Sequence, residues 1–201
     1  MPYSAFKKIE QIEEQFGLTI NQHHSLFAEV ETLQPSQTLK ETLHRNVSLA
    51  LNINTEKARS ELIIAPLLLE VRERLHNISL FLGIEFNVEA EKELNGYCDY
   101  ILSLSPNQAI LRAPVICVVE AKNEQIKSGY AQCIAEMIAA KRFNDNKSKP
   151  LNSILGVVTT GSNWKFITLQ NNSVLIDFEE YLIAEVDKIL GIFKAFIDSC
   201  L

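Results

Sequence analysis

The sequence is poor in the features that mark several classes of protein. It has only seven glycines and six prolines in 201 residues, too few for a collagen-like or low-complexity chain. Its four cysteines are widely spaced, with no CxxC pair and no histidine at ligand spacing, so neither a disulfide scaffold nor a zinc site is predicted. Hydrophobic residues make up 47% of the chain and charged residues 22%, which is typical of an ordinary globular protein.

Long apolar segments are also missing. The longest apolar run without a charge covers residues 113–119, whereas a membrane-spanning helix needs about 20 apolar residues. Lys7, Lys8 and Glu10 interrupt the first turns, so no secretory leader is expected. We therefore predict a cytoplasmic protein with reduced thiols and no membrane partner.

Several chemical motifs are absent as well. The sequence has no GxxxxGK[ST] or GxGxxG stretch and no G-x-S-x-G elbow, so nucleotide-driven chemistry and a serine hydrolase are not indicated. The net charge of −6 argues against a nucleic-acid coat protein, because such proteins are usually basic.

Apolar residues recur at helical spacing in the first part of the chain. They lie three or four positions apart over residues 6–16 and 39–51, and Gly17 is a typical helix stop. We interpret residues 1–55 as an N-terminal helical extension, separate from the rest. A longer helix is predicted from Thr55 to about His76, and Pro66 inside it predicts a kink or a restart.

The spacing of apolar residues changes to that of strands after Gly83. The run over residues 115–119 is nearly all β-branched, which is typical of a strand covered on both faces. Strands are expected over 84–88, 97–104, 115–119, 153–160, 165–169 and 174–178, and helices over 130–143 and 179–201, with a polar loop at 144–150. This order predicts a mixed α/β fold around one sheet, with residues 56–201 as one domain.

An acid and a lysine two positions apart end the most apolar strand. Side chains alternate between the faces of a strand, so Glu120 and Lys122 point the same way, about 7 Å apart. The simplest interpretation is a structural ion pair at the surface, at the end of the strand. The chain contains its own control, because residues 145–147 repeat the pattern in the predicted polar loop, where we interpret it as solvated charge.

The preceding strand adds a second carboxylate, Asp99, between apolar neighbours. Such a group is costly unless it is paired or bound to a cation. If residues 97–104 and 115–122 form an antiparallel hairpin, Asp99 and Glu120 lie side by side. A divalent cation would relieve their repulsion, and their hard oxygen atoms suit Mg²⁺.

This arrangement resembles the PD-(D/E)xK nuclease superfamily. The resemblance rests on Asp99 followed 21 residues later by Glu120, Ala121 and Lys122 on consecutive strands. It implies a restriction-endonuclease-like fold, with a central mixed β-sheet flanked by helices. It also implies that Asp99, Glu120 and the backbone carbonyl of Ala121 bind the metal, and that Lys122 is the catalytic lysine.

Two further residues match positions that the superfamily often uses. Glu61, on the helix before the sheet, would join the metal ligands; Glu56 and Glu70 are poorer matches. Gln132, on the helix after the lysine strand, would orient water or touch phosphate, although Gln132 and Glu136 together also fit an ordinary polar stripe. The resemblance covers residues 60–170 and is closest to bacterial restriction-subunit nuclease domains and their stand-alone relatives. Cys98 replaces the proline usually written before the aspartate.

Basic side chains gather in the part of the chain that carries the motif. Residues 111–150 hold seven basic and four acidic side chains, a net charge of +3, so the rest of the chain carries −9. Two interpretations stay open: a solvated helix end, or a patch that contacts a DNA backbone beside the metal. For the second, the predicted contacts are Lys127, Lys141, Arg142, Lys147 and Lys149.

These observations predict a DNA endonuclease dependent on Mg²⁺ or Mn²⁺, in a restriction, defence or mobile-element context, that hydrolyses phosphodiesters with metal-activated water. The alternative is a vestigial, non-catalytic subunit of the same fold that binds a protein partner. The acidic net charge and the lack of a separate DNA-binding domain are in its favour. The N-terminal helices are the expected surface for a homodimer or another protein partner.

Overall fold

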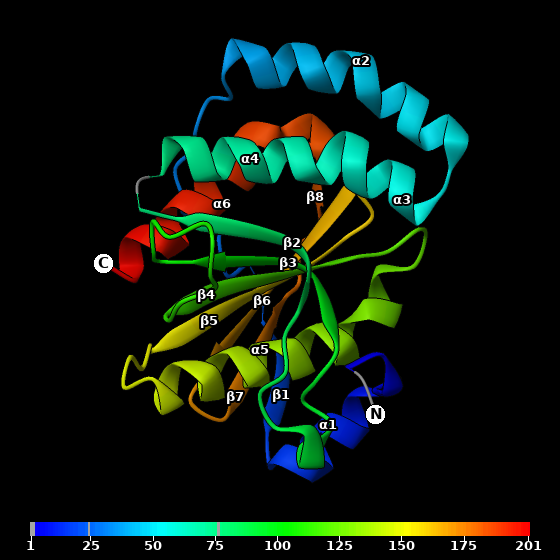
Figure 1. Ribbon diagram of the computed structural model, residues 1–201. Coiled ribbons are helices and arrows are strands. Elements are labelled where there is room, and N and C mark those ends of the chain that lie inside the picture. The colour runs from blue at the N-terminus through cyan, green and yellow to red at the C-terminus, as the bar shows by residue number, and fades with distance from the viewer. Residues whose placement is uncertain (1–2, 24, 76) are drawn as a thin grey trace.

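The computed structural model describes residues 3–23, 25–75 and 77–201 and shows three layers, a mixed sheet with helices on both faces (Figure 1). The α-helices are α1 (Ile9–Phe16), α2 (Gln37–Ile53), α3 (Glu56–Arg59), α4 (Ala65–Arg74), α5 (Tyr130–Asn146) and α6 (Val186–Ser199). The strands are β1 (Thr19–His23), β2 (Ser79–Glu85), β3 (Tyr97–Ser103), β4 (Val115–Ala121), β5 (Ser153–Thr159), β6 (Asn163–Gln170), β7 (Ser173–Asp177) and β8 (Tyr181–Leu182). Short 3₁₀ turns are η1 (Tyr3–Ala5), η3 (Ala90–Lys92), η4 (Ile126–Gly129) and η5 (Ile183–Glu185), and η2 (Ser60–Ile64) is a π-helical turn.

The sheet is open and has eight strands. Its order is β1-β7-β6-β5-β4-β3-β2, with β8 paired to β6. β2, β3 and β4 form an antiparallel meander, β5 is parallel to β4, and β6 and β7 continue antiparallel. The predicted α/β class and the mixed sheet flanked by helices are therefore confirmed.

The first 55 residues are not helical throughout. Residues Thr19–His23 form β1, which pairs in parallel with β7 at the edge of the sheet. The prediction of an all-helical segment is wrong at this point, because a polar edge strand lacks the apolar alternation that marks a half-buried strand. The predicted N-terminal helices are present as α1 and α2. The predicted domain boundary at residue 55 stays a prediction.

Two apolar cores cover the two faces of the sheet. α2, α4 and α6 pack on one face in a cluster that includes Trp164 and Phe166. α1 and α5 pack on the other face, and Figure 1 shows these two helix layers on opposite sides of the strands. None of the helices in the described ranges combines the length and apolar character that crossing a membrane requires.

Close packing fixes α5 against the centre of the sheet. A Cβ atom at Gly156 of β5 would lie 2.3 Å from Met137 Sδ and 2.9 Å from Cys133 Sγ, so a larger residue there would force these side chains of α5 to shift. The buried Asn144 near the end of α5 exchanges two 2.7 Å hydrogen bonds with the backbone N–H and C=O of Val115. α5 therefore lies along β4, with its first turns near the end of that strand and its last turn near the start.

The predicted disturbance at Pro66 is a π-helical turn within a helix that stays continuous, and not a restart. α3 passes into the π-helical turn η2, and α4 begins with Pro66 in its first turn. Proline has no N–H to donate to the carbonyl of Leu62. The side-chain amide of Asn46 on α2 donates to that carbonyl instead, at 3.1 Å. α4 ends at Arg74, and the predicted end at His76 lies outside the described residues.

One other prediction concerns an element near the motif. Residues 144–146 belong to the last turn of α5, so the predicted polar loop at 144–150 is wrong there. A tight turn joins β5 to β6, where Thr159 pairs with Trp164. The Trp164 indole is fully buried and donates to the carbonyl of Gly161 at 3.0 Å.

Candidate active site

Two acidic residues meet where β3 and β4 pair. In this antiparallel hairpin Tyr100 lies opposite Val119, so the same register continued by one pair places Asp99 opposite Glu120. Asp99 Oδ2 accepts a hydrogen bond of 2.8 Å from the backbone N–H of Ala121. The predicted hairpin is therefore confirmed, and the two carboxyls lie at the same end of the paired strands.

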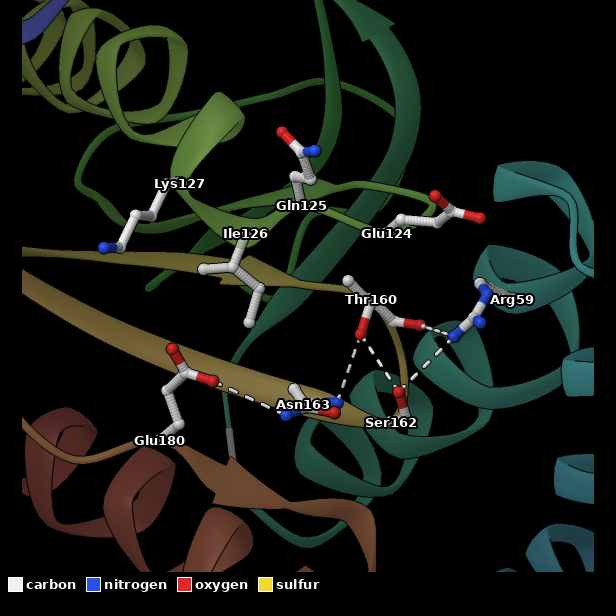
Figure 2. A pocket seen from close by; sticks show the side chains of 9 residues that line it. All are labelled: Arg59, Glu124, Gln125, Ile126, Lys127, Thr160, Ser162, Asn163 and Glu180. Atoms are coloured by element: carbon white, nitrogen blue, oxygen red, sulfur yellow. Dashed lines mark hydrogen bonds between the residues drawn. The ribbon is translucent and has the colours of Figure 1, made fainter.

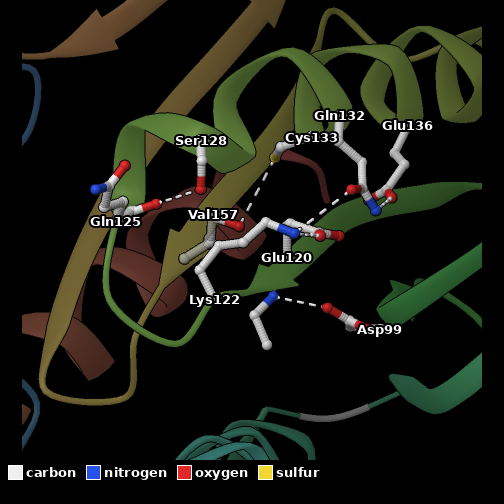
Figure 3. A network of polar contacts seen from close by, with 10 residues as sticks. Asp99, Glu120, Lys122, Gln125, Ser128, Gln132, Cys133, Glu136 and Val157 are labelled. Carbon is white, nitrogen blue, oxygen red and sulfur yellow. Dashed lines mark hydrogen bonds and ion pairs between the residues drawn. The ribbon is translucent and has the colours of Figure 1, made fainter. Parts of the chain in front are cut away.

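Lys122 joins the end of β4 to the first turn of α5 (Figure 3). Its Nζ forms an ion pair with Glu120 Oε1 and lies 3.5 Å from Oε1 of Gln132. Gly129 leaves room for the lysine, because a Cβ atom there would lie 3.1 Å from Lys122 Cε. The Lys122 side chain is only 19% exposed and that of Glu120 only 2%, so the ion pair is largely shielded from water. The structure thus brings together three of the predicted residues.

The network continues inward to Glu136, which the sequence does not single out from a polar stripe. Gln132 Nε2 donates to Glu136 Oε1 at 3.1 Å, and Figure 3 shows both side chains descending from α5 toward Glu120. Glu136 is fully buried. Within the described residues, Oε2 of Glu120 and Oε2 of Glu136 accept no N–H or O–H from other side chains, and the two carboxyls face each other. They hydrogen bond only when one of them carries a proton.

Burial and mutual proximity raise the pKa of these carboxyls. Desolvation, reinforced by the Asp99 carboxylate, raises the pKa of Glu120 to about 7, while Lys122 opposes the shift. Desolvation, with Glu120 adding, raises the pKa of Glu136 well above its usual range. Burial also raises the pKa of Asp99 against the opposing N–H of Ala121. Burial by itself would lower the pKa of Lys122, but Glu120 outweighs it and raises that pKa. The protonation of Glu120 is therefore linked to that of Glu136.

A small hollow of about 190 Å³ opens between the strand ends and α3. It is lined by Glu56, Lys57, Ser60, Glu61, Asp99 and Ala121. Glu61 thus shares a hollow with Asp99, although its side chain is 65% exposed and pairs with Lys57 at 3.8 Å. Glu70, the poorer sequence match, lies elsewhere and accepts hydrogen bonds from the N–H and hydroxyl of Ser36 at 2.7 and 2.6 Å.

The donor set fits a hard divalent cation held by few protein ligands. Carboxylates and waters are the ligands that Mg²⁺ prefers, and one or two carboxylates are enough to hold it. Asp99 and Glu120 supply two, and Glu120 Oε2 is a buried oxygen that lacks an N–H donor. No group of three or more acidic, histidine or cysteine side chains converges on one point in the described ranges. Ligation by Glu61 and by the Ala121 carbonyl therefore stays a prediction.

A larger cleft of about 490 Å³ lies beside the same strand ends (Figure 2). Its lining consists of Arg59, Glu124, Gln125, Ile126, Lys127, Thr160, Ser162, Asn163 and Glu180. Arg59 donates to the carbonyl of Thr160 at 2.9 Å and lies 3.4 Å from the Ser162 hydroxyl, so it ties α3 to the turn between β5 and β6. Lys127 is the predicted DNA contact that lines this cleft.

The other predicted DNA contacts lie at the opposite end of α5. They are Lys141, Arg142, Lys147 and Lys149. Lys122 touches the helix at Gln132, and Asn144 lies twelve residues further along, about 18 Å at 1.5 Å per residue. Lys141 and Arg142 each form an ion pair with an acidic side chain. The patch does not adjoin the carboxyls, contrary to expectation, because α5 runs back along β4. Its contact with DNA stays a prediction.

Comparisons of the chain with protein-family models, with curated proteins and with solved structures give no match. The chemistry of the site is therefore inferred from its own residues.

Proposed function

We propose that the protein is a DNA endonuclease that hydrolyses phosphodiester bonds with the help of Mg²⁺ or Mn²⁺. One observation carries the proposal: Asp99 accepts a hydrogen bond from the N–H of Ala121, next to Glu120 at the end of β4, and the Lys122 ammonium pairs with Glu120 and lies 3.5 Å from Gln132 Oε1. Structural ion pairs rarely need two adjacent carboxyls, a lysine and a half-buried glutamine together. This combination suits binding of a cation and stabilisation of a phosphorus transition state.

Each residue has a distinct part in the proposed reaction. Asp99 and Glu120 would hold the cation, which supplies positive charge for the phosphate and lowers the pKa of water. Lys122 would hold the attacking water or the phosphate oxygens with its ammonium. Gln132 would fix the direction of that lysine through the contact at 3.5 Å. Glu61 would approach from the far wall of the hollow that contains Asp99.

The proposal extends to the PD-(D/E)xK superfamily and its restriction-endonuclease-like fold. Its support is the order of elements: consecutive antiparallel strands carry the acids, the helix before them carries Glu61, and the helix after them carries Gln132. A mixed sheet flanked by helices is what that fold requires. A restriction, defence or mobile-element role follows from the same resemblance. The four cysteines are free thiols, which suits a reducing cytoplasm.

One observation favours the alternative, a non-catalytic subunit that binds a protein partner. The Lys122 ammonium is engaged with Glu120, and only 19% of the lysine side chain is exposed. Phosphate would have to displace part of that ion pair. The exposed apolar side chains Leu49, Leu51 and Ile53 of α2 would then serve a homodimer or another protein partner.

A cleavage assay separates the two functions. Linear, circular and branched DNA are incubated with the protein in Mg²⁺ or Mn²⁺ and with EDTA. We expect metal-dependent cleavage that falls at least about 100-fold in Lys122→Ala and Glu120→Ala, because each removes charge stabilisation at the reacting phosphate. Asp145→Ala, which alters the acid of the second acid-x-lysine pattern, is the matched control and should retain activity.

Two outcomes would contradict the nuclease proposal. Cleavage that survives both Lys122→Ala and Glu120→Ala would come from another site or another protein. Absence of cleavage under all conditions, together with absence of Mn²⁺ binding by calorimetry, would favour the non-catalytic subunit.

A further inference from the structure

A cavity of about 560 Å³ lies at the start of β4, remote from the carboxyls. It opens between the loop that joins β3 to β4 and the residues that follow α5. It is lined by Leu104, Ser105, Pro106, Ile110, Leu111, Arg112, Ala113, Phe143, Lys147 and Lys149. We call it the cationic pocket.

The charges around the cationic pocket are all of one sign. Arg112, Lys147 and Lys149 are exposed, and within the described residues no acidic side chain forms an ion pair with them or lines the pocket. The cleft beside the carboxyls mixes two basic with two acidic residues, and the small hollow holds three acids and one lysine. In a chain of net charge −6, an acid-free group of three cations indicates an anionic ligand.

The pocket also has an apolar wall, which an inorganic anion such as phosphate would not contact. Ile110 is 59% exposed, and Leu111 and Phe143 are partly exposed beside it. The Phe143 ring is held by an edge contact with Phe86, at 5.4 Å between centroids. A volume of about 560 Å³ falls within the range of small-molecule sites, roughly 300–1,000 Å³. These dimensions suit a ligand that joins a phosphate to a flat apolar body.

Hydrogen bonds hold the two segments that carry the cations, the β3–β4 loop and the residues after α5. The Ser103 hydroxyl bonds to the carbonyls of Arg112 and Pro114 and holds the loop. The C-terminus of α5 would by itself repel an anion. Its last carbonyls are capped, however, because the N–H groups of Lys147 and Lys149 donate to them at 2.9 to 3.2 Å. The positive side chains therefore outweigh the partial charge of the helix end.

We propose that the cationic pocket binds a nucleotide, with its phosphate between Arg112, Lys147 and Lys149 and its base against Leu111 and Phe143. The nucleotide is either free in solution or part of a DNA strand, since both present the same phosphate and base. This site is separate from the proposed nuclease centre and does not depend on it.

Binding measured without metal tests the proposal. AMP and a 5′-phosphorylated 20-nucleotide single strand are titrated into the full chain in EDTA by calorimetry. Lys147→Glu/Lys149→Glu should weaken binding about tenfold or more, because charge-assisted contacts to the phosphate are lost. Lys7→Glu/Lys40→Glu changes the net charge equally at exposed residues elsewhere and is the matched control. If the charge reversal prevents folding, Lys147→Ala/Lys149→Ala should weaken binding in its place. Leu111→Ala tests the contact with the base and should weaken the binding of AMP more than that of inorganic phosphate.

Each outcome bears directly on the proposal. AMP binding that is lost in the Lys147/Lys149 variants identifies the free nucleotide, and binding of the strand alone identifies DNA. Neither probe binding, or equal binding by the Lys147/Lys149 and Lys7/Lys40 variants, would overturn the proposal. Both titrations are made in EDTA and need neither metal nor cleavage, so a failure of the nuclease proposal leaves this result unaffected.

Discussion

The chain contains an acid, any residue and a lysine in sequence twice, and the two copies lie in opposite environments. In the first copy, Glu120 is 2% exposed and Lys122 19%. In the second copy, the Asp145 side chain is 41% exposed and pairs with Lys141 on its own helix. The second lysine, Lys147, lies past the end of α5 and is exposed.

The difference shows that burial, not the tripeptide, creates the unusual chemistry. At the end of β4, desolvation and a neighbouring carboxylate raise the pKa of Glu120 to about 7. At the end of α5, water screens the charges, and exposed ion pairs of this kind contribute little. Experiments that compare the two ends of α5 therefore test the interpretation of the site as a whole.

The largest expected contrast is in the dependence of stability on pH. Glu120 and Glu136 bind protons more tightly in the folded than in the unfolded protein, because burial raises the pKa of both. The contribution of these two carboxyls to stability is therefore fully present at low pH, and that of Glu120 is lost as pH rises from about 4.5 through about 7. For Glu120 the loss is on the order of 3 kcal/mol, at about 1.4 kcal/mol per pKa unit. Urea unfolding in EDTA at pH 5 and pH 8 measures it.

Glu136→Gln tests the origin of this dependence. The variant removes one of two facing carboxyls and retains its shape, so we expect it to be more stable than the wild type at pH 8 and nearly equal at pH 5. Asp145→Asn, at the other end of the helix, should leave the slope unchanged. A Glu136→Gln difference that is the same at both pH values would show that the carboxyls do not share their protons.

The first copy could be recognised from the sequence because its strand is so apolar. The β-branched run before Glu120 predicts a central strand, and an acid that follows such a run needs a partner. Asp99 could be paired with it by assuming a hairpin. The inward direction of Glu136 could not be predicted, because α5 is buried on several sides and its residues show no clear apolar stripe.

Long-range geometry accounts for the other errors. β1 pairs with β7, about 150 residues away in the chain, and no local pattern specifies that contact. The basic residues at the end of α5 were expected beside the metal because they are close to Lys122 in sequence. A helix that returns along its strand carries them away instead, about 18 Å from Gln132 to Asn144.

A smaller effect is expected from the residue that fixes this far end of the helix. Asn144→Ala leaves the N–H and C=O of Val115 buried without the two hydrogen bonds of 2.7 Å. The free energy of unfolding should fall by about 1–3 kcal/mol. Asn146→Ala, two residues on and exposed, is the control, with a change within about 0.5 kcal/mol. Equal costs for the two variants would show that Asn144 does not hold α5 to β4.

The smallest effect is expected for the acid of the second copy. Lys141 and Asp145 lie one turn apart with their charges 2.7 Å from each other, but both are partly exposed. A double-mutant cycle on the free energy of unfolding should give a coupling of about 0.3–0.5 kcal/mol. The Lys194–Asp198 pair of α6 has the same spacing and similar exposure and should give the same value. At 1 M salt, where the Debye length is about 3 Å, both couplings should shrink further. A coupling above about 1 kcal/mol for Lys141–Asp145 that resists salt would mean that the second copy is not a solvated pair, and the contrast between the two ends of α5 would no longer hold.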